Sequence, residues 1–104
     1  MAEIPNMTYE NVDDMLDTDR LLVVDFGAEW CVPCKRIGPI VAKFALDHPD
    51  QVEAAYVDIG KYPILAQRFG VMGVPTVILF RDKKEAKRFG SNLQFPMLIA
   101  ELCK

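Results

Sequence analysis

The sequence predicts an α/β fold in which a central mixed β-sheet is flanked by helices on both faces. The first indication is the run 21–26, which is apolar apart from Asp25 and is typical of a strand buried on both faces of a sheet. The second is the alternation of strand-like and helix-like segments. The third is a hairpin-like pair of strands near the carboxyl end, which adds antiparallel pairing to the parallel crossovers expected of strand–helix–strand units. At 104 residues, the chain 1–104 is expected to form a single domain.

The first half of the chain predicts two helices and two strands. A helix is expected after Thr8, whose hydroxyl can cap it, with apolar residues at 12, 15 and 16 on one face. The strand 21–26 follows, and then a helix from about residue 34 to residue 48, whose apolar residues recur every three or four positions. Residues 51–58 predict the second strand.

The second half predicts two more helices and a hairpin. Pro63 can open a short helix that ends at Gly70, a residue suited to a helix carboxyl terminus. Residues 76–81 and 85–89 predict two strands joined by a short turn that has no glycine, and Pro96 can start the last helix.

Composition and charge exclude several classes of function. The net charge of −3 gives no basic surface for nucleic acid, and no apolar run approaches the roughly 20 residues of a membrane-spanning helix. The first residues carry neither a basic nor an apolar stretch of the kind that directs secretion, so we expect a reducing, cytoplasmic location. In such a compartment a close pair of cysteines is expected to be catalytic or metal-binding rather than structural.

The segment Cys31-Val32-Pro33-Cys34 carries the most information about chemistry. It lies between the buried strand and the second helix, where a thiolate faces unpaired N–H groups and the positive end of the helix dipole. These groups should lower the pKa of the first thiol and leave an exposed nucleophile with a shielded partner behind it, as reversible dithiol–disulfide exchange requires. A zinc site is the alternative, but only Cys103 and His48 remain as further ligands and they form no second pair.

Three segments together resemble the thioredoxin family. The segment 30–35, Trp-Cys-Val-Pro-Cys-Lys, with 24–29 before it, is similar to that family's active-site segment. The segment 69–76 is similar to the family segment that ends in a cis-proline and enters a strand, and Gly90 is similar to a glycine of the family's client groove. The order and spacing of these pieces cover nearly the whole chain, so the resemblance implies the thioredoxin fold and a protein-disulfide reductase.

The resemblance implies a role for each motif residue. Cys31 is expected to attack the client disulfide, and Cys34 to resolve the mixed disulfide, which leaves the redox-active Cys31–Cys34 disulfide. Asp25, whose pKa burial should raise, is expected to accept the Cys34 proton, and Pro33 to tune the redox potential. The residues expected to bind the client are Trp30, Gly73, Val74 (before a cis Pro75), Pro75 and Gly90.

The chain departs from the family at several positions. Val32 stands where glycine is usual, Gly27 where tryptophan is frequent, and Tyr56 where lysine is common. Loss of a positive charge near Asp25 should make this carboxylate easier to protonate. Cys103 is expected to be a half-buried core residue, and the basic residues of the hairpin (Lys83, Lys84, Lys87 and Arg88) a solvated sheet edge.

The expected partners are disulfide-containing client proteins and a thioredoxin reductase of the flavin and NADPH type. No bound cofactor, metal, nucleic acid or membrane is expected, and the chain is expected to be a monomer. Two other functions stay open: a more oxidising disulfide isomerase, and a non-catalytic binding subunit that uses the same fold.

Overall fold

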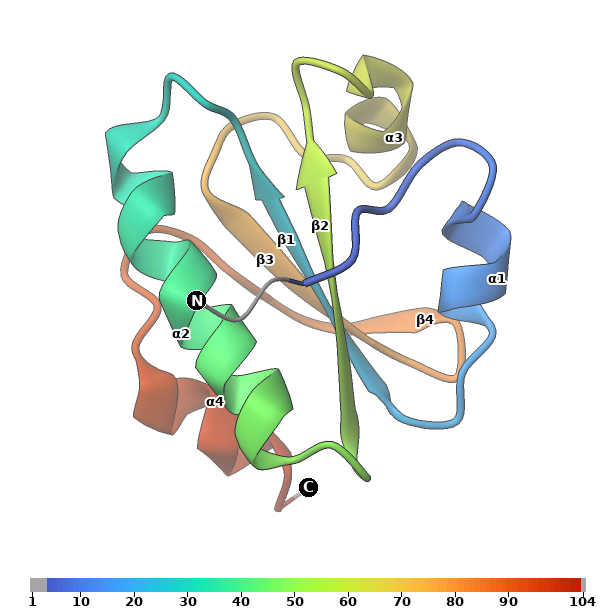
Figure 1. The fold of residues 1–104 in the computed structure, drawn as a ribbon, viewed down its shortest axis with the longest axis vertical. Helices are drawn as coiled ribbons and strands as arrows, with labels where there is room; N and C mark the ends of the chain where they lie inside the picture. Colours follow the sequence, from blue (N-terminus) through green and yellow to red (C-terminus); the bar gives the residue numbers. More distant parts are fainter. Residues whose placement is uncertain (1–3, 104) are drawn as a thin grey trace.

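A four-stranded sheet forms the centre of the computed structural model, which describes residues 4–103 (Figure 1). The strands lie in the order β2-β1-β3-β4. Their bounds are β1 Leu21–Gly27, β2 Val52–Asp58, β3 Thr76–Arg81 and β4 Lys84–Phe89. The helices are α1 Val12–Leu16, α2 Val32–Asp47, α3 Pro63–Arg68 and α4 Phe95–Glu101. The element order is the predicted one, and the mixed sheet of the predicted α/β class is confirmed.

The direction of β3 differs from the parallel crossover expected for a strand–helix–strand unit. The β1–α2–β2 unit is parallel as predicted, whereas β3 is antiparallel to β1 and β4 is antiparallel to β3. The cause is the length of α3. Its six residues rise only about 9 Å, whereas the seven residues of β2 extend about 23 Å. The chain therefore does not return to the start of β2, and β3 begins near the end where β2 finishes.

Each face of the sheet is covered by two helices. Val24 and Phe26 belong to the core cluster that includes residues of α1 and α3, whereas Leu21 and Val23 belong to the cluster that includes residues of α2 and α4. Successive side chains of a strand point to opposite faces, so the odd positions of β1 face α2. Asp25 is therefore placed under α2. This is the feature of the fold that matters most for the site.

The amino ends of α1 and α2 differ from the predicted ones. Helix α1 begins at Val12, and the turn that leads into it is capped by Thr8. The Thr8 hydroxyl accepts a hydrogen bond from the Asn11 N–H (3.2 Å), and the Asn11 Oδ1 accepts one from the Thr8 N–H (2.7 Å), which closes a turn before the helix. Helix α2 begins at Val32 rather than at residue 34, because Cys31 acts as its N-cap.

No helix within residues 4–103 combines the length and the apolar character needed to cross a membrane.

The β3–β4 hairpin closes without a glycine. Asp82 and Lys83 both have positive φ values, 54° and 69°, as in the two-residue turns that suit the twist of a hairpin. The prediction of a solvated edge is confirmed for β4, since every residue from Lys84 to Arg88 is exposed.

Candidate functional site

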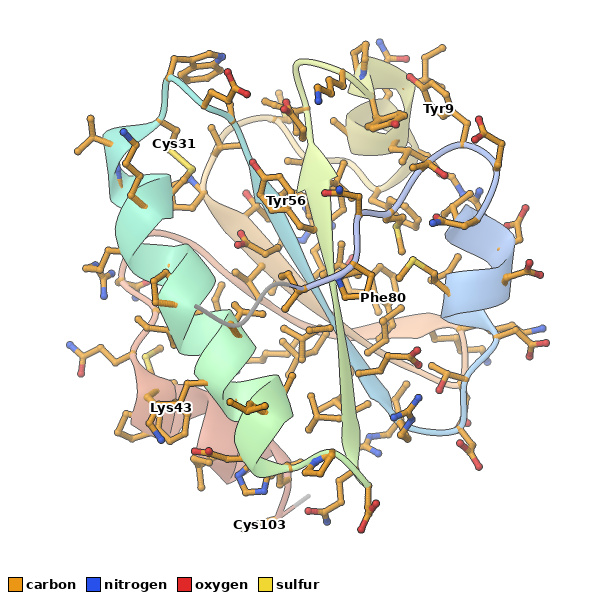
Figure 2. The ribbon with its side chains drawn as sticks, viewed as in Figure 1. Tyr9, Cys31, Lys43, Tyr56, Phe80 and Cys103 are labelled. Carbon is orange, nitrogen blue, oxygen red and sulfur yellow. A yellow bond between two sulfur atoms is a disulfide. The ribbon has the colours of Figure 1, made fainter. Side chains whose placement is uncertain are left out.

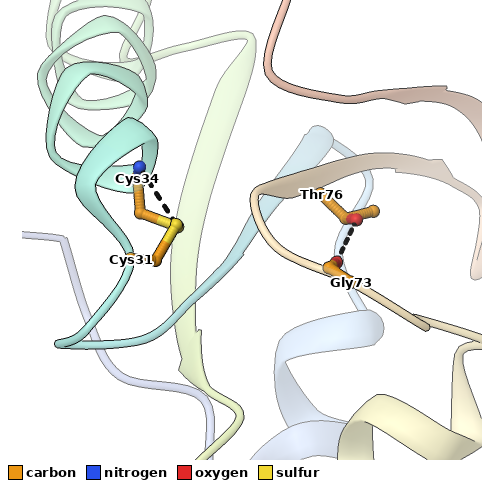
Figure 3. The surroundings of a disulfide bond; sticks show 4 residues. All are labelled: Cys31, Cys34, Gly73 and Thr76. Carbon is orange, nitrogen blue, oxygen red and sulfur yellow. Dashed lines mark hydrogen bonds between the residues drawn. A yellow bond between two sulfur atoms is a disulfide. The ribbon is translucent and has the colours of Figure 1, made fainter.

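The two cysteines of the Cys-x-x-Cys segment meet at the amino end of α2 (Figure 3). Their Cα atoms lie 5.3 Å apart and their sulfurs form a disulfide. As the N-cap residue, Cys31 has extended backbone, and its Sγ accepts a hydrogen bond from the Cys34 N–H (3.3 Å). Helix α2 thus directs one of its otherwise unpaired amide donors at the sulfur of Cys31.

The burial of the two cysteines differs from the predicted asymmetry. In the disulfide form Cys31 is 5% exposed and Cys34 is 9% exposed, so the expectation of an exposed first sulfur and a shielded second one is wrong for this state. The reason is local packing, because Ala28, Ile59 and Val74 form a small cluster with the two cysteines.

Two apolar side chains next to the disulfide are strongly exposed. Trp30 is 72% exposed and Val32 is 74% exposed. Core packing, the alternative explanation for Trp30, is therefore excluded. The indole and the isopropyl group thus form an exposed apolar surface beside the disulfide.

The segment Gly73–Thr76 lies across from the disulfide (Figure 3). The Val74–Pro75 peptide bond is cis, as the resemblance implies, and Val74 packs against the cysteine cluster. The Thr76 hydroxyl donates to the Gly73 carbonyl oxygen (2.7 Å), which closes the turn around the proline.

A groove of about 500 Å³ adjoins this segment. Three of the predicted client-binding residues, Gly73, Val74 and Pro75, line it together with Pro33 from α2. Trp30 and Gly90 are not among its lining residues, although Ser91, the neighbour of Gly90, is. The structure therefore brings the cis-proline segment and Pro33 together, and leaves Trp30 and Gly90 outside this groove. We call it the docking groove; its lining residues are Pro33, Gly70, Met72, Gly73, Val74, Pro75, Thr76, Arg88 and Ser91.

Asp25 is the one charged residue that is buried among residues 4–103. Its side chain is 2% exposed, and its Oδ1 has no hydrogen-bond partner within this part of the chain. Burial raises its pKa from 3.8 to about 7, because the charged form loses its hydration. The carboxylate is thus poised to exchange a proton near neutral pH.

Asp25 shares a cavity of about 660 Å³ with Cys34 and Tyr56. Tyr56 is the register partner of Asp25 on β2, so both side chains lie on the face covered by α2. Figure 2 shows Tyr56 projecting toward the end of α2 that carries Cys31. Burial raises the pKa of Tyr56, and the carboxylates of Asp58, Asp25 and Glu29 raise it further.

Tyr56 occupies the space beside Gly27, and both positions depart from the family pattern. A Cβ atom at Gly27 would lie 3.1 Å from the Tyr56 Cε1, 3.2 Å from its hydroxyl oxygen and 3.5 Å from the Cys34 Cβ. The two departures are therefore one structural unit, in which the absence of a side chain at 27 leaves room for the ring at 56.

The remaining cysteine is placed elsewhere. Cys103 lies at the other end of the molecule from Cys31 (Figure 2) and is exposed, so the expectation of a half-buried core residue is wrong. It follows the carboxyl end of α4, where no neighbouring element covers it.

Within residues 4–103 no group of three or more His, Cys, Asp or Glu side chains is arranged to hold a metal ion.

Two arginines near the docking groove had no predicted role. Arg88 was expected only to solvate the sheet edge, and Arg36 carried no expectation. Both donate hydrogen bonds to backbone carbonyls 18 to 57 residues away in the sequence. Neither a motif nor a periodicity signals such contacts, because they depend on the tertiary fold.

An exchangeable disulfide at a helix amino end, above a buried carboxylate and beside a cis-proline segment, defines a thiol–disulfide oxidoreductase. Comparison with known families agrees: the Thioredoxin family model matches residues 3–103, and this chain belongs to the thioredoxin family. The predicted thioredoxin fold is thereby confirmed.

Several thioredoxins resemble the chain. It is 34% identical to a thioredoxin of Alicyclobacillus acidocaldarius over 79% of its own length and 78% of that protein. It is 40% identical to thioredoxin-1 of Saccharomyces cerevisiae over 82% of each chain. It is 31% identical to thioredoxin Y1, chloroplastic, of Arabidopsis thaliana, and there it covers 96% of its own length but 59% of the relative.

Proposed function

We propose that this chain reduces disulfides in client proteins and is then re-reduced by a thioredoxin reductase. The observation that carries the proposal is the Cys31–Cys34 disulfide at the amino end of α2, with the Cys31 Sγ in hydrogen-bond contact with the Cys34 N–H. Hydrogen bonds to the charged form of a group stabilise that form, so this donor favours Cys31 as the leaving and attacking sulfur.

The reaction proceeds in two exchange steps. The Cys31 thiolate attacks one sulfur of the client disulfide; a mixed disulfide forms, and the other client sulfur leaves as a thiolate and takes up a proton. Cys34 then gives its proton to the Asp25 carboxylate and attacks the Cys31 sulfur. The mixed disulfide breaks, and the second client sulfur leaves as a thiolate that takes up a proton, which balances the one given to Asp25. The client has then gained two electrons and two protons, and Cys31 and Cys34 are joined in a disulfide.

Asp25 is proposed as the proton acceptor for Cys34. Both residues line one cavity, and a pKa of about 7 lets the carboxylate take up and release a proton near neutral pH. Pro33 is proposed to tune the redox potential, since its ring restricts the turn between the two cysteines.

Client binding is proposed for the surface beside the disulfide. Gly73, Val74 and Pro75 line the docking groove, and an extended client segment would lie along it. Trp30 and Gly90 are proposed to extend this contact surface beyond the groove. The Trp30 exposure of 72% supports that role for the indole.

The partners, the location and the domain organisation are proposals as well. A flavin-dependent reductase that uses NADPH is the expected electron donor, and residues 1–104 are proposed to act as one monomeric domain without a bound cofactor. A cytoplasmic location fits a disulfide that must be repeatedly reduced, because that compartment keeps thiols reduced.

A coupled insulin-reduction assay tests the proposal. The protein is supplied with NADPH and a flavin-type reductase, or with a ferredoxin-linked donor, and insulin precipitation is followed. We expect turnover with the wild-type protein and with Cys103→Ser, and none with Cys31→Ser. Turnover by Cys31→Ser, or no reduction of insulin with any donor or with dithiothreitol, would contradict the proposal.

Equilibration with a glutathione buffer separates the reductase from an isomerase. A potential near the −180 mV typical of protein disulfide isomerase would favour the more oxidising function. A Cys31→Ser, Cys34→Ser double variant that retains full biological activity would favour a binding subunit instead.

A further inference from the structure

Arg88 joins two segments of the chain, β4 and residues 69–70, through one guanidinium group. Its Nη1 donates to the Gly70 carbonyl oxygen (2.9 Å) and its Nη2 to that of Phe69 (2.6 Å). The other edge of the group pairs with Glu85, through Nε to Oε2 (2.9 Å) and Nη2 to Oε1 (2.7 Å). The two carbonyls belong to the carboxyl end of α3, where a positive charge is favourable.

Arg36 of α2 makes a similar connection to another segment of the chain. Its Nη1 donates to the Leu93 carbonyl oxygen (3.0 Å), and its Nη2 donates to the Ser91 carbonyl oxygen. These carbonyls lie in the segment between β4 and α4. Arg36 therefore holds that segment against the helix that carries Cys34.

The four carbonyls belong to segments that form walls of the docking groove. Gly70 and Ser91 line the groove themselves, and Phe69 and Leu93 belong to the same two segments. Strand β4, which carries Arg88, ends at Phe89 and leads into the segment that Arg36 contacts. The two arginines therefore connect α2 to residues 91–93, and β4 to residues 69–70. We call these two sets of contacts the arginine clamps.

We propose that Arg88 and Arg36 are positioning residues for client recognition, which hold the segments that line the docking groove in the arrangement that an extended client segment needs. This inference rests on the proposed function. A preformed groove avoids the entropic cost of ordering loops on binding, so the clamps act on the binding of an extended client. The two side chains bond to backbone carbonyls and to Glu85, not to the sulfurs, so the exchange chemistry itself should be independent of them.

The test compares a protein client with a small disulfide. Arg88→Met and Arg36→Met keep the aliphatic stem and remove the donors. For both variants we expect the KM for insulin to rise at least fivefold with kcat unchanged within twofold, whereas the reduced protein should react with 5,5′-dithiobis(2-nitrobenzoic acid) within twofold of the wild-type rate. Arg88→Lys keeps the positive charge but lacks the planar set of donors of a guanidinium group. Its KM for insulin should therefore stay more than half as far above the wild-type value as that of Arg88→Met.

Arg20→Met is the matched control. Arg20 also donates to a backbone carbonyl, that of Pro49 (3.1 Å), and pairs with Glu53 (3.3 Å), but it precedes β1 and lies outside the docking groove. Its loss should leave the KM for insulin within twofold of wild type. If Arg88→Met does not fold, the same measurements are made on Arg88→Lys and Arg36→Met.

The outcomes are distinguishable. An unchanged KM for insulin in the folded clamp variants of an active protein would overturn the inference alone, as would a parallel loss of reactivity toward the small disulfide. Failure of the wild-type protein to reduce insulin would overturn the proposed function and this inference together.

Discussion

The ring of Tyr56 lies against the backbone of Gly27, so close that a Cβ atom at position 27 would stand 3.1 Å from the ring edge. Because Tyr56 is the register partner of Asp25, the same ring also lies beside the buried carboxylate. The two positions at which this chain departs from the family pattern around its acid therefore depend on each other.

A double-mutant cycle should detect this dependence. We expect Gly27→Ala to destabilise the protein by about 1 kcal/mol, because the added methyl forces the Tyr56 ring to move. In a Tyr56→Ala background the same change should be neutral or stabilising by up to about 0.5–1 kcal/mol, since alanine is less flexible than glycine in a strand. Urea unfolding of the wild type, the two single variants and the double variant gives the coupling free energy between positions 27 and 56. Equal effects of Gly27→Ala in both backgrounds would contradict the packing described here.

The raised pKa of Asp25 predicts a pH-dependent stability. Its pKa in the folded protein, about 7, lies above the ordinary value of 3.8, so the folded state binds the proton more tightly. The stabilisation that the protonated Asp25 carboxyl group provides is complete below about pH 4, and it is lost as the pH rises through 7. Asp25→Asn cannot ionise and should therefore gain stability over the wild type between pH 4 and pH 8, by about 2–4 kcal/mol.

Urea unfolding of the disulfide form at both pH values measures this difference. Asp19→Asn, a change at an exposed carboxylate, serves as the control and should show less than about 0.5 kcal/mol of difference between the two pH values. An Asp25→Asn gain that is the same at pH 4 and pH 8 would mean that the carboxylate does not titrate in this range.

The β3–β4 turn predicts a stabilising substitution. Lys83 has a φ of 69°, a conformation that glycine adopts without strain. Lys83→Gly should therefore stabilise the protein by about 0.5–1 kcal/mol, reduced slightly by loss of the exposed Lys83–Asp17 ion pair. Lys84→Gly, one residue later in β4, should instead destabilise by a similar amount. Thermal unfolding distinguishes the two, and destabilisation by Lys83→Gly would contradict the assigned turn.

The exposure of Cys103 predicts its labelling pattern. In the oxidised, folded protein only Cys103 should react with iodoacetamide, because the other two sulfurs form the disulfide. Mass spectrometry should show one added group, and three after reduction and unfolding. If the oxidised protein takes up no label, Cys103 is shielded, as the sequence led us to expect. Cys103→Ser is the control that identifies the labelled residue.

Local patterns were sufficient to predict most of the architecture. The apolar run of β1, the spacing of apolar residues in α2 and the prolines that open α3 and α4 each indicate an element, because they reflect burial and backbone geometry within a few residues. The Cys-x-x-Cys segment and the buried acid on β1 were found in the same way.

Features that depend on contacts between distant segments were not predictable. The direction of β3 follows from the shortness of α3 relative to the sheet, and the burial of Cys31 follows from packing by Ile59 and Val74. Cys103 was expected to be a half-buried residue of the last helix, but α4 ends before it. Arg36 and Arg88 carried no signal, since their partners are backbone carbonyls, which every residue type provides.

Competition between Cys31 and Cys103 for a limiting alkylating reagent tests the central claim most directly. The fully reduced protein is treated at pH 7 with less than one equivalent of iodoacetamide, and the labelled peptides are quantified. Because the amino end of α2 favours the thiolate, we expect Cys31 to react at least tenfold faster than the exposed Cys103. Equal labelling, or faster labelling of Cys103, would show that the helix does not activate Cys31.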